Sequence, residues 1–406
     1  MRDALYKPRD APARCPPASA IPDFSLVAGG PLHELLCKVR LADAGLGYLP
    51  RRIVIIVFGA WLPLLILSVV QGYAWRGVRV PFLLDPTVHL RLLLALPLLL
   101  WAEGQVHDWM RPFARCFLER DIVPGSVYPR FAAALASLVR SRDSIYPELI
   151  IAALVATLGV WINVHRAGTL TYSTWFCLDP SGRAGITAAG WWYAVISLPI
   201  FQFVLFRWYF LLFLWFQFLW RVSRMDLRLE PTHPDRSGGL GFIGYTTLGF
   251  WPVLLAQGTL STAVMARGIF YGGMTLTHYK LEICLLLALT LFWVVCPLLT
   301  FAPMMSRAKR AGRDHYDFLS QSYVLEFAHK WLHKAPPPEH LLGTSDIQSL
   351  ADLGNAYQVV KTMHLIPIGK DTIAQMMVCP LIPVVPLALT ILPIDKVLSH
   401  LVAAVF

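Results

Sequence analysis

The stretch Ala189–Trp220, AGWWYAVISLPIFQFVLFRWYFLLFLWFQFLW, decides the fold class of this chain. Its only charged residue is Arg207. A helix rises about 1.5 Å per residue, so this stretch is longer than the roughly 30 Å hydrocarbon core of a bilayer. The tryptophans at both ends, from Trp191 to Trp220, are typical of the two membrane interfaces. We therefore expect a membrane-spanning helix that is strongly tilted or extends beyond the bilayer.

Six other stretches are apolar enough to cross a membrane. The whole chain is 56% hydrophobic and only 15% charged, which disfavours a soluble protein of 406 residues. The sequence therefore predicts an all-α polytopic transmembrane bundle of about seven spans, with a helical cytoplasmic subdomain. The other expected spans are Ile53–Gln71, Val88–Glu103, Leu149–His165, Phe242–Ala266, Leu281–Met304 and Thr372–Ile394.

The distribution of positive charge predicts the orientation. With the N-terminus in the cytoplasm, Lys and Arg in the cytoplasmic parts outnumber those in the external parts by about three to one. The net charge of +10 is thus interpreted as topological, and nucleic acid is not expected as a partner. No apolar leader stands in residues 1–22, and no cysteine pair has the spacing of a metal or redox motif. The cofactor stays unknown.

The same reading divides the chain into four parts. They are a cytoplasmic tail with an interfacial helix (1–52), a six-span region (53–304) that includes a cytoplasmic helical loop (105–147), a cytoplasmic helical segment (305–371), and the last span with an amphipathic tail (372–406). The last span is rich in proline, and whether it crosses or re-enters is left open.

Arg207 is the most informative single residue. An arginine inside a span costs about 2.5–3.5 kcal/mol on insertion scales, so it should face protein or water and have a partner. Glu103 is the carboxylate best placed to pair with it. The pair is expected either to lock two helices together or to place a cation in a permeation path or an anion site; the alternative is that Arg207 only extends its charged end to the membrane interface.

The second candidate is the loop Glu230–Gly244, EPTHPDRSGGLGFIG. His233, Asp235 and Arg236 stand close together in it, and Gly239 and Gly241 lead into the next span. A glycine-rich turn at a helix N-terminus presents N–H groups to anions. The alternatives are a turn that only reverses the chain, and a metal or acid–base site. The glycines match GxGxxG in letters, but no strand precedes them, so a dinucleotide site is disfavoured.

A third, weaker candidate is a metal site. Glu326, His329 and His333 fall near one face of a predicted cytoplasmic helix. Aromatic residues surround them, which is also typical of an ordinary packed or solvated face.

Three features together resemble a family of uncharacterised multi-pass proteins of the bacterial inner membrane. They are THPDRSGGLGF (232–242), SLADLGNAYQVVKTM (349–363) and the proline-rich final span with its short tail. The resemblance covers residues from about Phe24 onwards. It implies the compartment and the layout, but no activity and no site residues.

The leading functional hypothesis is a channel or transporter for a small solute or ion, with an anion as one alternative, acting alone or as a homo-oligomer in the bilayer. The first rival is a membrane-embedded enzyme or metal-binding protein that uses the His/Asp/Gly-rich turn. The second is a scaffold or accessory subunit that binds a cytoplasmic protein through 306–371. Walker, nucleophile-elbow and HExxH motifs are not found, which disfavours the familiar ATPases, serine hydrolases and zincins.

Overall fold

The computed structural model describes residues 24–41, 48–167, 172–178, 185–332 and 344–390. Within these ranges the chain is helical, and the only β-structure is a set of isolated bridges. The expectation of an all-α bundle is therefore confirmed. The α-helices are α1 (Pro31–Lys38), α2 (Leu49–Val70), α3 (Pro86–His89), α4 (Leu96–Met110), α5 (Phe113–Glu119), α6 (Tyr128–Asp143), α7 (Ile145–Leu154), α8 (Val160–Ala167), α9 (Ala188–Trp192), α10 (Leu198–Val222), α11 (Gly241–Thr246), α12 (Trp251–Gly272), α13 (Lys280–Leu299), α14 (Ala302–Trp331), α15 (Ser345–Thr362), α16 (Lys370–Val378) and α17 (Val385–Ala388).

Short π- and 3-10-helical segments join some of these helices into continuous spans. The π-helical segments are η3 (Leu90–Ala95), η4 (Val155–Gly159) and η5 (Tyr193–Ser197), and the 3-10 segments are η2 (Phe82–Leu84), η6 (Thr247–Phe250), η7 (Leu276–Tyr279) and η8 (Cys379–Val384).

The described residues contain seven helical stretches long and apolar enough to cross a membrane, so the chain is a multi-pass membrane protein. The second and fifth begin or end well outside the expected bounds. The stretches are Leu49–Val70, Pro86–Glu119, Ile145–His165, Ala188–Val222, Gly241–Gly272, Leu276–Leu299 and Lys370–Ala388.

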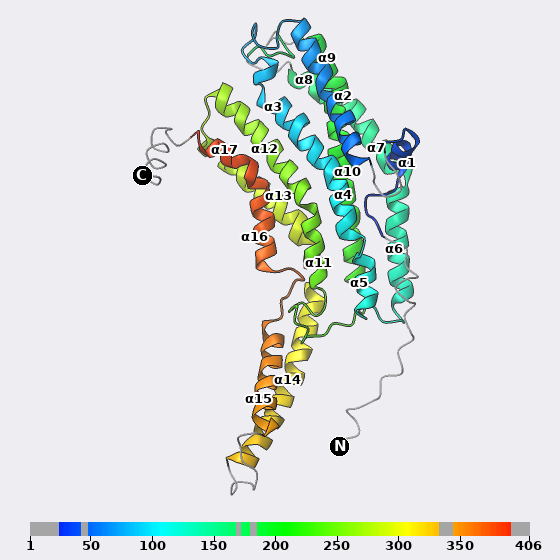
Figure 1. Cartoon of the computed structure of the whole chain (residues 1–406), viewed down its shortest axis with the longest axis vertical. Helices are drawn as coiled ribbons and strands as arrows, with labels where there is room; N and C mark the ends of the chain where they lie inside the picture. The colour runs from blue at the N-terminus through cyan, green and yellow to red at the C-terminus, as the bar shows by residue number, and fades with distance from the viewer. Residues whose placement is uncertain (1–23, 42–47, 168–171, 179–184, 333–343, 391–406) are drawn as a thin grey trace.

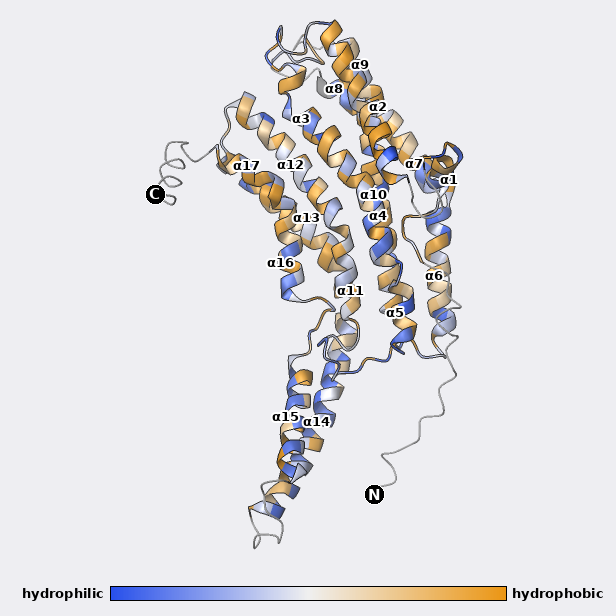
Figure 2. Cartoon of the chain, in the orientation of Figure 1, coloured by the Kyte–Doolittle hydropathy of each residue, from blue (hydrophilic) through white to orange (hydrophobic). Residues whose placement is uncertain are grey.

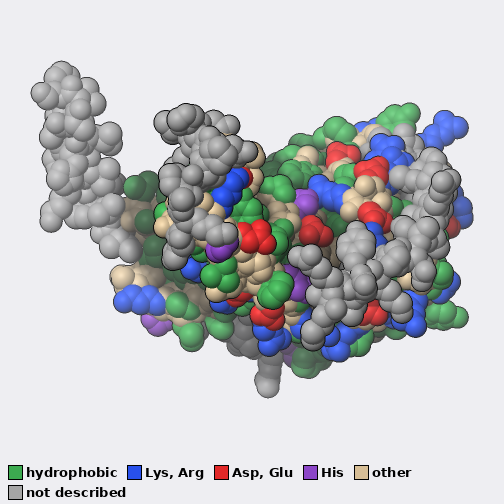
Figure 3. Space-filling model, turned by 90° about the horizontal axis from the view of Figure 1, so that it is seen from below, with side chains coloured by type: hydrophobic (Ala, Val, Ile, Leu, Met, Phe, Trp, Pro, Cys, Tyr) green, Lys and Arg blue, Asp and Glu red, His purple; other side chains and the backbone are tan. Residues whose placement is uncertain are grey.

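The helices form a bundle from which a long hairpin projects. Figure 1 shows α14 continuing beyond the bundle and α15 returning beside it. Figure 2 shows the contrast in hydropathy between the apolar bundle and the more polar hairpin. We call the end of the bundle that carries this hairpin the hairpin side, and the opposite end the far side. Charged side chains of both signs are spread over the hairpin side (Figure 3).

Proline accounts for several of the irregular turns. Pro97 and Pro199 lie in the first turns of α4 and α10, directly after η3 and η5. A proline lacks the N–H that continues an α-helix and its ring crowds the preceding turn, and a π-helical turn widens the helix at that point. In the last span, Pro380, Pro383 and Pro386 interrupt the helix, which becomes α16, η8 and α17.

Aromatic side chains in edge-to-face contact tie the hairpin side of the bundle together. The rings of Phe113 and Trp215 are 4.7 Å apart, and those of Phe117 and Phe242 are 4.9 Å apart, centre to centre. These contacts join α5, α10 and α11 in edge-on geometry, which is the favourable arrangement for aromatic pairs. The cluster fixes the start of α11 and therefore the glycine-rich loop before it.

Candidate functional site

Arg207 lies inside the bundle, 5% exposed, and its guanidinium contacts two carboxylates. Nη1 donates to Oε1 of Glu103 over 2.9 Å, and Nε donates to Oε1 of Glu148 over 3.0 Å. The expected contact with Glu103 is therefore present. The two acceptors come from α4 and α7, so one arginine side chain joins three spans.

Arg52 of α2 completes the set, because its Nη2 donates to Oε2 of Glu103. We call Arg52, Glu103, Glu148 and Arg207 the charge network. Every member is less than a tenth exposed. The network holds two positive and two negative side chains, which compensate one another away from water. Removing one partner from such a set leaves an uncompensated buried charge.

The network also anchors α1. The second carboxylate oxygen of Glu148 accepts a hydrogen bond of 2.7 Å from the backbone N–H of Leu32, in the first turn of α1. The first-turn N–H groups of a helix have no partner within the helix, and the positive end of its dipole favours a carboxylate. The short helix expected at the membrane surface is thus fastened to the bundle.

Arg52 and Glu148 were not among the site residues expected from the sequence. Both stand one residue before an expected span, at Ile53 and Leu149, and such positions are typical of side chains in the interface. One feature of the sequence could have identified Glu148. An arginine inside a span requires a carboxylate partner, and Glu148 lies directly before the expected third span. Sequence alone could not show which of the charges at span ends turn inward.

A cavity of about 540 Å³ lies beside the charge network. Arg52, Glu103 and Arg207 form its polar end, and aliphatic and aromatic side chains form the rest of its lining. We call it the α1 pocket, because α1 contributes part of its wall. Six elements contribute to the lining, which includes Leu36 of α1, Ile56 of α2, Leu100 of α4, Ala152 of α7, Ala156 of η4 and Phe203 of α10.

The pocket opens on the part of the bundle that faces lipid. The rest of the protein buries only 22% of the most apolar 18 residues of α2. It buries only 17% of the most apolar 18 residues of the span Ile145–His165. Ile55, which lines the pocket, is 44% exposed. An apolar surface of this kind in a membrane protein is covered by lipid tails.

One polar atom at the pocket's polar end has no partner. Nε of Arg52 is buried and makes no hydrogen bond within the described residues, although the side chain is only 1% exposed. A buried donor left without an acceptor costs about 1–3 kcal/mol. The atom has almost no accessible surface, so a molecule in the α1 pocket contacts it only after the Arg52 side chain moves.

The backbone N–H groups of the glycine-rich loop bind the side chain of a residue in the same loop. The Asp235 carboxylate accepts the N–H groups of Ser237, Gly239 and Gly241 over 2.8, 3.2 and 2.9 Å. His233 lies beside it, with Nδ1 2.9 Å from Oδ1. Burial by itself raises the pKa of Asp235, but these N–H donors outweigh it and lower that pKa below its ordinary value. The N–H groups expected to hold an anion thus already hold a carboxylate.

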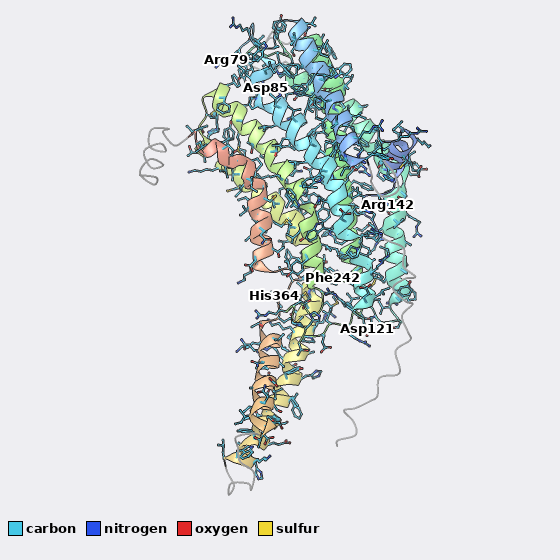
Figure 4. All side chains as sticks on the ribbon, in the orientation of Figure 1. Arg79, Asp85, Asp121, Arg142, Phe242 and His364 are labelled. Carbon is cyan, nitrogen blue, oxygen red and sulfur yellow. The ribbon has the colours of Figure 1, made fainter. Side chains whose placement is uncertain are left out.

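The loop also packs against the segment that follows α15. The carbonyl of Arg236 accepts the N–H of His364 over 2.7 Å, and a Cβ on Gly244 would lie 2.3 Å from the Pro367 carbonyl oxygen. Phe242 and His364 mark this junction in Figure 4. The glycine pattern therefore serves close packing, and Arg236 itself is exposed.

The expected metal residues do not form a described site. Glu326 and His329 are exposed on α14, and His333 lies outside the described residues. Across the described ranges, no group of three His, Cys, Asp or Glu side chains is arranged to hold a metal ion.

Comparisons with protein-family models, with curated proteins and with solved structures find no match for this chain.

Proposed function

We propose that this integral membrane protein is a carrier for a small amphipathic solute, which it binds in the α1 pocket. The solute has an apolar chain and a head group with a hydrogen-bond acceptor. The observation that carries the proposal is an apolar pocket, open toward lipid, whose polar end is formed by Arg52, Glu103 and Arg207. We further propose that the protein resides in a bacterial inner membrane with the hairpin side in the cytoplasm, as the charge distribution and the family resemblance suggest.

The size and lining of the pocket support this class of solute. A volume of about 540 Å³ falls within the roughly 300–1,000 Å³ of small-molecule sites, which are mostly apolar with a few placed polar groups. A chain in the pocket would contact Ile56 and Phe203, and the head group would reach Arg52. Such a molecule could enter sideways from the bilayer.

The charge network gives less support to a bare inorganic anion. The positive charges of Arg52 and Arg207 are matched by Glu103 and Glu148. A hydrated ion would also lose its water against an aliphatic wall, which is costly without compensating charge. An amphipathic solute avoids both penalties, because most of its surface is apolar.

The test is binding and flux in vesicles that contain the full-length protein. Gly59 lines the pocket, and a Cβ placed there meets nothing within 4 Å, so Gly59→Leu should fit and fill the space. Gly354 of α15 is a matched control, because it is equally open and lies in the hairpin. The probes are a long-chain fatty alcohol, a fatty acid and chloride.

We expect Gly59→Leu to weaken binding of a chain-bearing probe by at least about tenfold, the equivalent of about 1.4 kcal/mol, and Gly354→Leu to leave it unchanged. Chloride flux should not exceed that of protein-free vesicles. Equal binding by wild type and Gly59→Leu would rule out this pocket, and binding without flux would reduce the carrier to a binding protein.

The hairpin favours the scaffold as a second candidate function. Phe318 and Leu325 on α14 are 72% and 59% exposed, and Leu332 directly after α14 is 72% exposed, although the hairpin lies beyond the apolar bundle. Exposed apolar side chains of this size can mark a protein-binding surface. The test compares the proteins that co-purify with the full-length protein and with its Phe318→Ser/Leu325→Ser variant. Partners that bind the wild type but not the variant would support a scaffold.

A further inference from the structure

A second pocket lies far from the charge network, where α10 ends and α14 begins. Its volume is about 450 Å³, and we call it the α10–α14 pocket. Unlike the α1 pocket, it is lined largely by polar groups. Ser223, Arg224 and Asp226 lie on one side of it, and Met304, Arg307 and Ala308 lie on the other.

The pocket lies at the edge of the membrane. The fourth candidate span ends at Val222 and the sixth at Leu299, so the lining residues follow directly after two spans on the hairpin side. Trp220, one turn before Arg224, is 46% exposed, as expected of a residue at the interface. The pocket is thus at the depth of the lipid head groups.

Two of the residues that line this pocket are arginines without a carboxylate partner among the described residues. The Arg224 guanidinium lies 5.5 Å from the centre of the Trp220 ring. Nε of Arg307 donates to the Pro303 carbonyl over 3.3 Å. Neither arginine forms an ion pair with any residue that the structure describes, and both are exposed. Asp226 is the single acidic residue of the lining, so the pocket has an excess of positive charge.

We propose that the α10–α14 pocket binds the phosphate of an anionic phospholipid. The planar guanidinium group matches phosphate oxygens in pairs. Basic pockets between spans at the membrane surface are suited to anionic head groups. The apolar side chains of Met304 and Leu227 beside the arginines would contact the first part of the acyl chains. The proposal does not depend on the α1 pocket.

The test is lipid retention by the purified full-length protein, followed by native mass spectrometry with phosphatidylglycerol. Phosphatidylcholine is the comparison lipid, and inorganic phosphate is the competitor. Each of Arg224→Gln and Arg307→Gln should weaken retention about fivefold, since each basic side chain near a membrane surface contributes about 1 kcal/mol to anionic lipid binding. Asp226→Asn should strengthen it. Arg310→Gln, an exposed arginine of α14 outside the lining, should change nothing.

Retention that is equal in all four variants, or equal for the two lipids, would overturn the proposal. Inorganic phosphate that displaces the lipid at comparable concentration would assign the pocket to a soluble anion and overturn the lipid assignment. Because the variants replace exposed side chains, each should fold, and stronger binding by Asp226→Asn serves as an independent positive result.

Discussion

Glu148 contacts Arg207 through one carboxylate oxygen at 3.0 Å and holds the backbone of α1 with the other. A single side chain thus links the centre of the bundle to a helix outside it. Arg207 also donates a hydrogen bond to Glu103, and Glu103 accepts a second one from Arg52. The wall of the α1 pocket is therefore held by the same ionic contacts that hold the spans together.

Breaking the charge network should destabilise the bundle. Glu103→Gln leaves Arg52 and Arg207 without their shared carboxylate, and loss of one partner of a buried pair costs about 3–5 kcal/mol. We expect a clear loss of stability in detergent unfolding. Glu34→Gln, an exposed carboxylate of α1, should change stability by less than about 0.5 kcal/mol. Similar values for the two variants would contradict a structural role for the network.

The carboxylate of Asp235 should make the stability of the folded protein depend on pH. A lowered pKa in the folded state means that the ionised carboxylate stabilises the protein at pH values above its ordinary pKa of 3.8. This contribution is lost as the pH falls through the lower, folded-state pKa.

Asp235→Asn should therefore lower stability at neutral pH, by about 0.5–2 kcal/mol if the loop behaves like other carboxylate caps. The gap between wild type and variant should narrow as the pH falls from neutral to below 3.8. Melting temperatures across this range provide the measurement. A gap that stays constant with pH would show that the charge of Asp235 is not what stabilises the loop.

Gly258 should be required for docking of the last span. A Cβ at Gly258 of α12 would lie 2.0 Å from the carbonyl oxygen of Pro380, in η8. Backbone cannot yield as a flexible side chain does, so Gly258→Ala should destabilise the protein by about 1–3 kcal/mol. Gly354→Ala in α15, where nothing lies within 4 Å, should instead stabilise its helix slightly. Thermal unfolding of both variants checks the prediction, and two changes of the same sign would refute it.

The proposed orientation can be tested by cysteine labelling in intact cells. Arg76 lies near the far side and Arg310 in the hairpin, and both are exposed. A membrane-impermeant thiol reagent should label Arg76→Cys in intact cells, whereas Arg310→Cys should react only after lysis. The parent chain with its native cysteines supplies the background. Labelling of Arg310→Cys in intact cells would show that the hairpin lies outside the cell membrane and would contradict the proposed topology.

The sequence predicted the spans well because lipid imposes a strong local requirement. Each span needs about 20 apolar residues in a row, and such runs are visible without any knowledge of their neighbours. Prediction was weakest at the ends. Pro86–Glu119 exceeds the expected Val88–Glu103, because residues such as Val106 and Phe113, which are buried against other helices, continue the helix although the hydropathy falls.

The sequence by itself determined that this chain is a helical membrane protein and that Arg207 must have a carboxylate partner, since an unpaired charge in lipid is costly. Only the tertiary structure decided that Glu103, Glu148 and Arg52 share that task. It also decided that the loop glycines surround Asp235 rather than an anion. Side chains far apart in the chain meet only when helices pack, and no local pattern records which face of a helix turns inward.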